Sequence, residues 1–253
     1  MPLFGFLALL VGAAAVTGGV FVVARLVPVG WRKAHNDVLG IVYAQIGVLY
    51  AVVLAMVVVG VWDTRAKAHE NTYAETNALL QIAWYSRTLP PQDRARLGGL
   101  TEAYTRRVVR EEWPLLGEQR ADPTAWGMFT DIRELINTRQ PATGPDQVRY
   151  ESALDSVAQL GDARRERVNE AASARVPPLL WVALLIGALV TIVFAQLFGM
   201  DSVRAHAAVV FSVSLTVGVL LLIVYEFNYP FSGALRVGPT AFELALDRIR
   251  GLT

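Results

Sequence analysis

The residues of this chain that could carry out chemistry are few and scattered. The three histidines, His35, His69 and His206, lie far apart in the sequence, so we expect each to be a solvated or interfacial residue rather than a ligand. The chain has no cysteine, which excludes disulfides, thiolate metal sites and cysteine nucleophiles. It also has no glycine-rich phosphate loop, Gly-x-Ser-x-Gly elbow or His-Glu-x-x-His motif. We therefore expect no catalytic residue, no bound metal, no cofactor and no enzyme activity.

Neighbouring carboxylates, which acid–base catalysis can use in pairs, occur at Glu111 with Glu112 and at Glu166 with Glu170. Both pairs belong to amphipathic helical patterns interleaved with arginine, and such charges usually form a solvated face. The net charge of +1 favours no nucleic-acid partner. We therefore expect these carboxylates to be solvated and to have no catalytic role.

Four long apolar runs dominate the sequence, and each reaches the ~20 residues that a helix needs to cross the hydrocarbon of a bilayer. In lipid the backbone polar groups must be satisfied within the segment, so each run should be a transmembrane helix. The first run lacks the positively charged start of a signal peptide, and we expect it to be retained. The runs are Leu3–Ala24, Val38–Trp62, Val176–Met200 and Ala205–Tyr225.

The runs predict an all-α, multi-pass protein of the inner (plasma) membrane, in which two pairs of helices flank a polar insert. We expect transmembrane helices 1 and 2 in residues 1–62, a helical extramembrane insert in 63–175, transmembrane helices 3 and 4 in 176–226, and a tail in 227–253. No segment alternates with a period of two, so no sheet is expected. The outer helices of the insert are expected to continue the second and third spans.

Two shorter helices outside the spans have a clear apolar side. Asp122-Pro123 is a strong helix start, because a capping residue precedes a proline at the first helical position. The stripe of that helix consists of Trp126, Phe129, Ile132 and Ile136. The tail helix begins at Pro239 and either lies at the membrane interface or packs on the insert. Its apolar side consists of Phe242, Ala245, Leu246 and Ile249.

The second apolar run contains the most informative polar and small residues. Gln45 is costly in hydrocarbon, so its amide needs a partner helix or water. Gly47, Ala51 and Ala55 are four residues apart and stack on one helix face, where small side chains let helices approach closely. We therefore expect tight packing, within one subunit or between the subunits of a homo-oligomer in the lipid bilayer.

A short motif, Asn228-Tyr-Pro-Phe-Ser-Gly233, follows the fourth run, and Val237, Pro239 and Phe242 come after it. His35-Asn-Asp-Val-Leu-Gly40 opens the second run, and Arg164-Arg-x-Arg precedes Pro178-Leu-Leu-Trp181. Together with the two pairs of spans, these stretches resemble the bacterial bestrophin-like family, formerly a domain of unknown function. The signature positions are His35, Asn36, Asp37, Asn228, Pro230, Phe231, Gly233 and Pro239.

True bestrophins are pentameric anion channels gated by calcium, with a second membrane helix that lines the pore and an insert that forms a cytosolic funnel. The resemblance thus implies an oligomeric, channel-like protein for anions. This sequence has neither an acidic calcium clasp nor an aromatic pore neck in its second run, so calcium gating is not carried over. Under this hypothesis, the pore or bundle interior is lined by Gln45, Leu49, Val52 and Met56, and one pore mouth has Arg32 and His35.

Two other hypotheses remain open. The chain could be a non-conducting membrane scaffold or sensor whose helical insert binds a partner. A transporter is the third hypothesis, and its sign would be discontinuous spans, but no proline interrupts the middle of any run.

The distribution of basic residues predicts the sidedness, although two parts of the chain disagree. The loops on one side carry four Lys or Arg near the membrane, whereas the insert side carries nine, so the insert and both termini are expected to be cytoplasmic. The first hairpin alone predicts the opposite, since no Lys or Arg precedes it. The four are Arg25, Arg32, Lys33 and Arg204; the nine are Arg65, Lys67, Arg164, Arg165, Arg167, Arg175, Arg236, Arg248 and Arg250.

Overall fold

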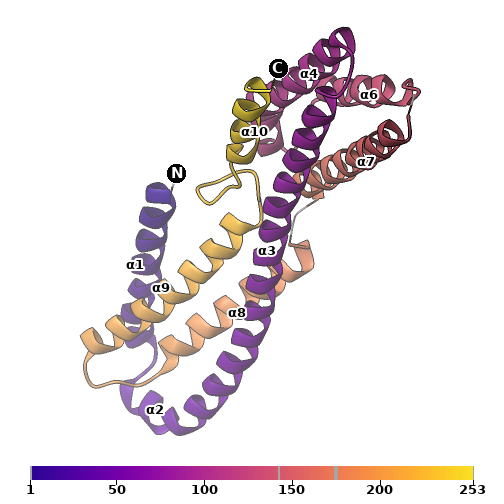
Figure 1. Cartoon of the computed structure of the whole chain (residues 1–253). Helices are drawn as coiled ribbons and strands as arrows, with labels where there is room; N and C mark the ends of the chain where they lie inside the picture. Colours follow the sequence, from indigo (N-terminus) through magenta and orange to yellow (C-terminus); the bar gives the residue numbers. More distant parts are fainter. Residues whose placement is uncertain (1, 142, 174–175, 253) are drawn as a thin grey trace. The chain divides into compact units, whose positions relative to one another are not determined.

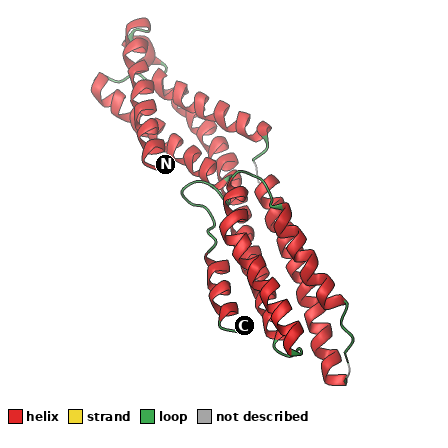
Figure 2. Ribbon diagram, turned by 90° about the horizontal axis from the view of Figure 1, so that it is seen from above, coloured by secondary structure: helices red, strands yellow, loops and turns green. Residues whose placement is uncertain are grey.

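The computed structural model describes residues 2–141, 143–173 and 176–252, and throughout these ranges the regular structure is helical (Figure 2). The all-α prediction is therefore confirmed. The chain divides into two compact units. The membrane unit comprises residues 1–62 and 175–228, and the insert unit comprises residues 63–174 and 229–253.

The membrane unit contains the four predicted spans. They are α1 (Pro2–Leu26), the first part of α3 (Asn36–Ser86), α8 (Pro178–Leu197) and α9 (Val203–Phe227), and each is long and apolar enough to cross a bilayer (Figure 1). The hairpin between α1 and α3 contains a short helix, α2 (Val29–Ala34), which the sequence did not predict. Pro28 precedes α2 with an extended ψ of 138°, so it ends the first span.

Apolar contacts hold the spans together, but most of their surface stays uncovered. The helix α1 packs beside α9 and α8, and Val20 is fully buried with Ala195 and Val210. On the outward faces, large apolar side chains such as Phe4 and Leu179 are about four-fifths exposed, at 80% and 79%. Water does not favour so much exposed hydrocarbon, whereas lipid does, so this is an integral membrane protein.

The insert unit is a helical bundle with one irregular segment. It contains the second part of α3, α4 (Pro91–Arg107), the π-helix η1 (Val108–Glu112), α5 (Trp113–Gly117), α6 (Pro123–Asn137), α7 (Gly144–Ser173) and α10 (Thr240–Arg250) (Figure 1). Asp122 caps α6 as predicted, since its carboxylate accepts a hydrogen bond from the Thr124 N–H at 3.0 Å.

The core of the insert contains most of the predicted apolar stripes. Phe129, Ile132 and Ile136 of α6 are buried, whereas Trp126 remains 40% exposed. In α10 the predicted apolar side is buried in the insert core, so this helix packs on the insert rather than on a membrane surface. Its buried residues are Phe242, Ala245, Leu246 and Ile249.

Only one of the two outer insert helices continues a span. The helix α3 runs unbroken from Asn36 to Ser86, as expected. By contrast, α7 ends at Ser173 and α8 begins at Pro178, so the predicted continuity into the third span is wrong. Pro177 has a ψ of 142°, because the residue before a proline is driven away from the helical region. Ala174 and Arg175 lie outside the described residues.

Candidate functional site

The proposed pore-lining residues lie on one face of α3. Gln45, Leu49, Val52 and Met56 follow at steps of four, three and four residues, which places them on the same side of a helix. In the single chain all four are exposed, and Leu49 and Met56 reach 68% and 72%. We call these four residues the α3 outer face. Nothing within the described chain covers it.

The opposite side of α3 explains this orientation. Leu54, Val57 and Val61 are buried against Leu184 of α8 and Val224 of α9. This packing fixes the rotation of the helix about its axis and turns Gln45 outward. Gln45 lies nine residues after the start of α3, about 14 Å along the helix axis. Its amide forms no hydrogen bond with any described residue.

Arg32, one of the two proposed mouth residues, is buried in the hairpin end of the membrane unit. Only 3% of it is exposed, and its Nη1 donates to the Phe198 carbonyl at 3.1 Å. No described carboxylate pairs with this guanidinium, and its Nε has no partner there. A positive charge is therefore fixed at the end of the unit from which α3 begins.

His35 and Asp37, by contrast, are exposed beside it. The ring of His35 stacks on Trp31 with centroids 4.2 Å apart, and its Nδ1 lies 2.7 Å from the Trp31 carbonyl. These contacts stay within the hairpin, so His35 remains accessible from outside the chain.

The signature residue Asn36 joins the two hairpin loops of the membrane unit. Its Nδ2 donates to the Gly199 carbonyl at 2.9 Å, and its Oδ1 accepts from the Gly199 N–H at 2.9 Å. The Asn36 amide is therefore engaged with the other loop. A Cβ on Gly199 would lie only 2.5 Å from the Lys33 backbone nitrogen, so the loops meet backbone to backbone.

The tail signature is a second structural clamp. The Asn228 Oδ1 accepts a hydrogen bond from the Val176 N–H at the start of the third span. In the insert unit, the Val237 N–H donates to the Pro230 carbonyl at 2.7 Å, and Gly233 takes a positive φ of 76° that favours glycine. Phe231 packs edge-on against Trp113, with centroids 5.6 Å apart, and Pro239 precedes α10. These positions shape the loop rather than carry chemistry.

Five polar side chains are buried together inside the insert, and we call them the ion cluster: Glu75, Tyr104, Glu112, Arg164 and Arg167. Arg167 donates from Nε to Glu75 at 2.7 Å and from Nη2 to Glu112 at 2.9 Å. Arg164 holds Glu112 with two hydrogen bonds of 2.6 and 2.8 Å. Tyr104 donates to Glu75 and accepts from Arg164. Two carboxylates therefore balance two guanidiniums.

Aromatic rings cover the guanidiniums of the ion cluster. Arg167 lies over the rings of Trp113 and Phe242, at 5.4 Å from each centroid. The Arg164 guanidinium lies 5.2 Å from the centroid of the Trp126 ring. This contact explains why a tryptophan occupies a partly exposed position on α6. Such cation–π contacts add to the ion pairs when water is excluded.

The charges shift the titration of the cluster. Burial alone would raise the pKa of the Glu112 carboxyl, but the positive charges of Arg167 and Arg164 outweigh burial and hold this pKa below its ordinary value. Burial and the neighbouring Glu75 charge raise the pKa of the Tyr104 phenol well above its ordinary value. The phenol therefore stays protonated and remains a hydrogen-bond donor.

The expectation that Glu112 and Glu170 are solvated was wrong, although Glu111 and Glu166 are exposed. Glu112 is fully buried in the ion cluster. Glu170 is half-buried and accepts from the Asn71 amide at 2.8 Å, and burial, with the nearby Glu166 charge, raises its pKa to about 7. These two carboxylates are not fully solvated, because each lies on the inward-facing, apolar side of its helix.

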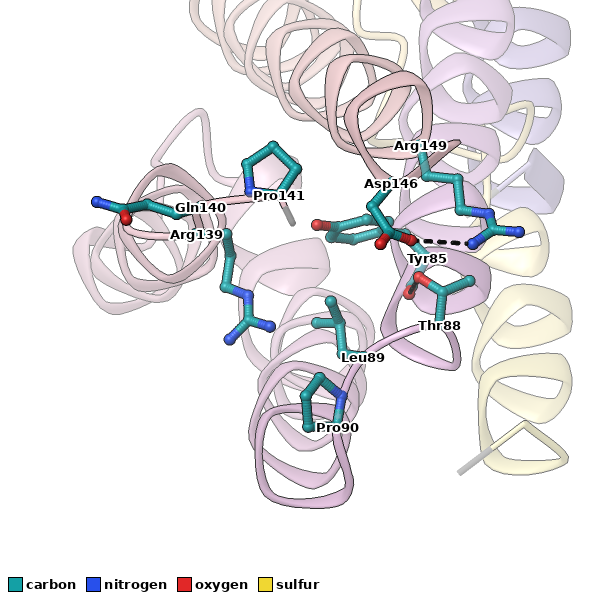
Figure 3. Close-up of a pocket in the computed structure, with 9 residues that line it drawn as sticks. All are labelled: Tyr85, Thr88, Leu89, Pro90, Arg139, Gln140, Pro141, Asp146 and Arg149. Atoms are coloured by element: carbon teal, nitrogen blue, oxygen red, sulfur yellow. Dashed lines mark hydrogen bonds and ion pairs between the residues drawn. The ribbon is translucent and has the colours of Figure 1, made fainter. Parts of the chain in front are cut away.

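A pocket of about 420 Å³ lies in the insert at the C-terminal end of α3 (Figure 3). Tyr85, Leu89 and Arg139 form part of its wall together with Asp146 and Arg149. Arg149 pairs with Asp146 at 3.1 Å, as the dashed line in Figure 3 marks, and Arg139 pairs with Asp93 outside the lining. Both guanidiniums are therefore satisfied within the insert.

No cluster of three or more His, Asp or Glu side chains within the described ranges could hold a metal ion. The chain instead has long lipid-exposed helices, two asparagine clamps and a buried ion cluster in its insert. A family model described as the bestrophin-like domain matches residues 10–242. The chain belongs to the bestrophin-like family. The resemblance inferred from the sequence is thereby confirmed.

The bestrophin-like chain also resembles solved structures in its fold. One is a crystal structure of a membrane protein, and another is a mutated bacterial bestrophin homologue from Klebsiella pneumoniae. Each is 12% identical, with a TM-score of 0.74 over 98% of this chain and 98% of that chain. At this identity the likeness establishes the fold. Comparison with curated proteins gave no match.

Proposed function

We propose that this bestrophin-like protein is a subunit of an oligomeric membrane channel for anions. The observation that carries the proposal is the α3 outer face, which is exposed in the single chain although the opposite side of the helix is packed. An amide at the depth of Gln45 is costly in hydrocarbon and needs water or a neighbouring subunit. Copies of α3 around a water-filled pore supply both.

The charge at the start of α3 supports anions as the permeating species. Arg32 is buried without a described carboxylate partner, so its charge contributes a positive potential at that end of the membrane unit. A positive potential at a pore mouth raises the local concentration of anions. The family resemblance favours the same sign.

The first prediction concerns conduction. Purified protein in planar bilayers is expected to show single-channel steps, and Gln45→Leu is expected to change their conductance or anion selectivity, because it removes the polar group of the α3 outer face. Ser212→Ala is the matched control in another span, since the Ser212 hydroxyl bonds back to the Ala208 carbonyl of its own helix at 2.9 Å. Bilayers that remain silent across varied pH, calcium and lipid composition would overturn the channel proposal.

A second candidate function is a non-conducting scaffold or sensor whose insert binds a partner. The pocket of Figure 3 favours it, because a cavity of about 420 Å³ with polar and apolar walls can accept a small molecule or a side chain of a partner. Silent bilayers combined with Gln45 buried between helices of an assembled oligomer, without an aqueous path, would favour this function over conduction.

The second prediction concerns sidedness, with the insert and termini in the cytoplasm. The chain has no cysteine, so single cysteines can be introduced without background. A membrane-impermeant maleimide added to intact cells is expected to label Ala34→Cys in the hairpin and to spare Thr143→Cys in the insert. The reason is the excess of Lys and Arg on the insert side. Labelling of Thr143→Cys alone would place the insert outside.

A further inference from the structure

A pocket of about 410 Å³ lies in the insert unit beside the tail signature. Its walls are largely apolar and come from η1, α5 and the loop that follows Asn228; they include Val109, Trp113, Pro114 and Phe231. Arg236 is the charged side chain among its lining residues, and Ser232 supplies a hydroxyl. We call this cavity the tail pocket, and its one formal charge is positive.

The two polar groups of the tail pocket are available to a ligand. Arg236 is exposed, and it makes no ion pair or hydrogen bond with any residue that the structure describes. The Ser232 hydroxyl likewise has no partner among those residues. A guanidinium and a hydroxyl that both donate hydrogen bonds, with no carboxylate in the wall, suit an anion with several oxygen atoms.

The loop that carries these groups is held in place by its backbone. The Val237 N–H donates to the Pro230 carbonyl at 2.7 Å, and the Ser232 N–H donates to the Tyr229 carbonyl at 3.1 Å. The Trp113 indole donates to the Val237 carbonyl at 3.2 Å, which fixes the ring that forms one wall. Arg236 is thus presented from an ordered loop, and a ligand need not order the loop to bind.

The loop contacts α3 a short way beyond the end of the second apolar run. The side chain of Arg65 donates to the Leu235 carbonyl at 2.7 Å, and Arg65 follows Trp62, the last residue of the apolar run, by three residues of continuous helix. Three residues rise about 4.5 Å along a helix axis. Leu235 is 45% exposed beside Arg236, so an apolar side chain and a cation project from the loop together. This combination is typical of a membrane-interface contact.

We propose that the tail pocket binds the phosphate group of an anionic membrane lipid through Arg236 and Ser232, with Leu235 in contact with the acyl boundary. A phosphate ester accepts from a guanidinium in a bidentate manner and from a hydroxyl at the same time. The apolar walls then face the glycerol and the first methylenes of the lipid. The binding is independent of whether the protein conducts ions.

The test compares lipid and free phosphate on the full chain in detergent, with bound copies counted by native mass spectrometry. Short-chain phosphatidylglycerol is expected to bind the wild type, and Arg236→Gln is expected to weaken that binding about tenfold, because it removes the charge-assisted hydrogen bonds of the guanidinium. Arg133→Gln, an exposed arginine of α6, is the matched control and should bind as the wild type does.

The remaining measurements distinguish binding of a lipid phosphate from binding of free inorganic phosphate. Leu235→Ser is expected to weaken phosphatidylglycerol and to leave inorganic phosphate unaffected, because only the lipid reaches the apolar side chain. Equal binding of phosphatidylglycerol by the wild type and Arg236→Gln would overturn the proposal. Binding of inorganic phosphate as tight as that of the lipid, with no effect of Leu235→Ser on either, would make the pocket a free-anion site and would also overturn it.

Discussion

Replacing Arg167 with methionine is expected to lower the free energy of unfolding of the insert by about 3–5 kcal/mol. The substitution leaves one guanidinium, that of Arg164, to balance the charges of Glu75 and Glu112. Both carboxylates are fully buried. An uncompensated buried charge costs several kcal/mol. The methionine side chain keeps most of the apolar contacts of the arginine stem, so the loss of charge dominates the effect. Urea unfolding of the full chain in detergent, followed by circular dichroism, measures the difference.

Arg165→Met is the matched control, because Arg165 is exposed on the same helix and its one ion-pair partner among the described residues is Asp162. It is expected to change the stability by less than about 0.5 kcal/mol. The effect of Arg167→Met should also depend on pH. The pKa of Glu112 is lower in the folded chain than in the unfolded chain, so its stabilising contribution is complete above the unfolded value of about 4.3 and is lost as the pH falls through the folded value. Equal losses for Arg167→Met and Arg165→Met would contradict the ion cluster.

The second large effect is expected at Gly199, where alanine should destabilise the membrane unit by about 1–3 kcal/mol. The added Cβ would lie 2.5 Å from the Lys33 nitrogen and 2.8 Å from the Arg32 carbonyl carbon, and backbone atoms cannot move aside as a side chain can. The two hairpin loops must then separate, which also strains both hydrogen bonds from Asn36. Thermal unfolding in detergent reports the change.

Gly40→Ala provides the comparison for Gly199→Ala, because no heavy atom lies within 4 Å of a Cβ at Gly40. In the interior of a helix, alanine is favoured over glycine by roughly 0.5–1 kcal/mol, so this variant should be as stable as the wild type or more stable. A similar loss in both variants would mean that the close approach of the loops does not determine stability.

The elements of the fold follow largely from apolar periodicity. The four spans, the capped start of α6 and the apolar side of α10 were all predicted from residue spacing, because burial in lipid or in a core requires apolar side chains at those steps. The break between α7 and α8 was missed. Its cause, Pro177 followed by Pro178, is visible in the sequence, but the direction of the chain on either side depends on packing.

The ion cluster was missed because charged residues were assigned to solvent by type. A stricter use of spacing would have found it. Glu112 lies four residues after Val108, which is itself four residues after Tyr104, and all three are buried. Arg164 and Arg167 likewise lie four and seven residues after the buried Leu160. The spacing marks these charges as inward, but the partner of each depends on how distant helices pack.

The α3 outer face was predicted in part. The spacing of Gln45, Leu49, Val52 and Met56 defines a common side of the helix, and the packing of Leu54 and Val57 turns that side outward. The periodicity does not show whether water, lipid or another subunit covers the α3 outer face. A face with three apolar side chains and one amide is compatible with each of them. The role of these residues in a pore therefore stays a prediction.

The ion cluster limits when the insert can fold during synthesis. Arg167 is separated from Glu75 by 92 residues and from Glu112 by 55, so the acidic half of the cluster leaves the ribosome well before the basic half. Until α7 emerges, Glu75 and Glu112 keep their hydration, because burial without counterions is unfavourable. The insert can therefore complete its core only after α7 has been synthesised. A chain that stalls before Arg164 exposes an open core to the quality-control machinery of the cell.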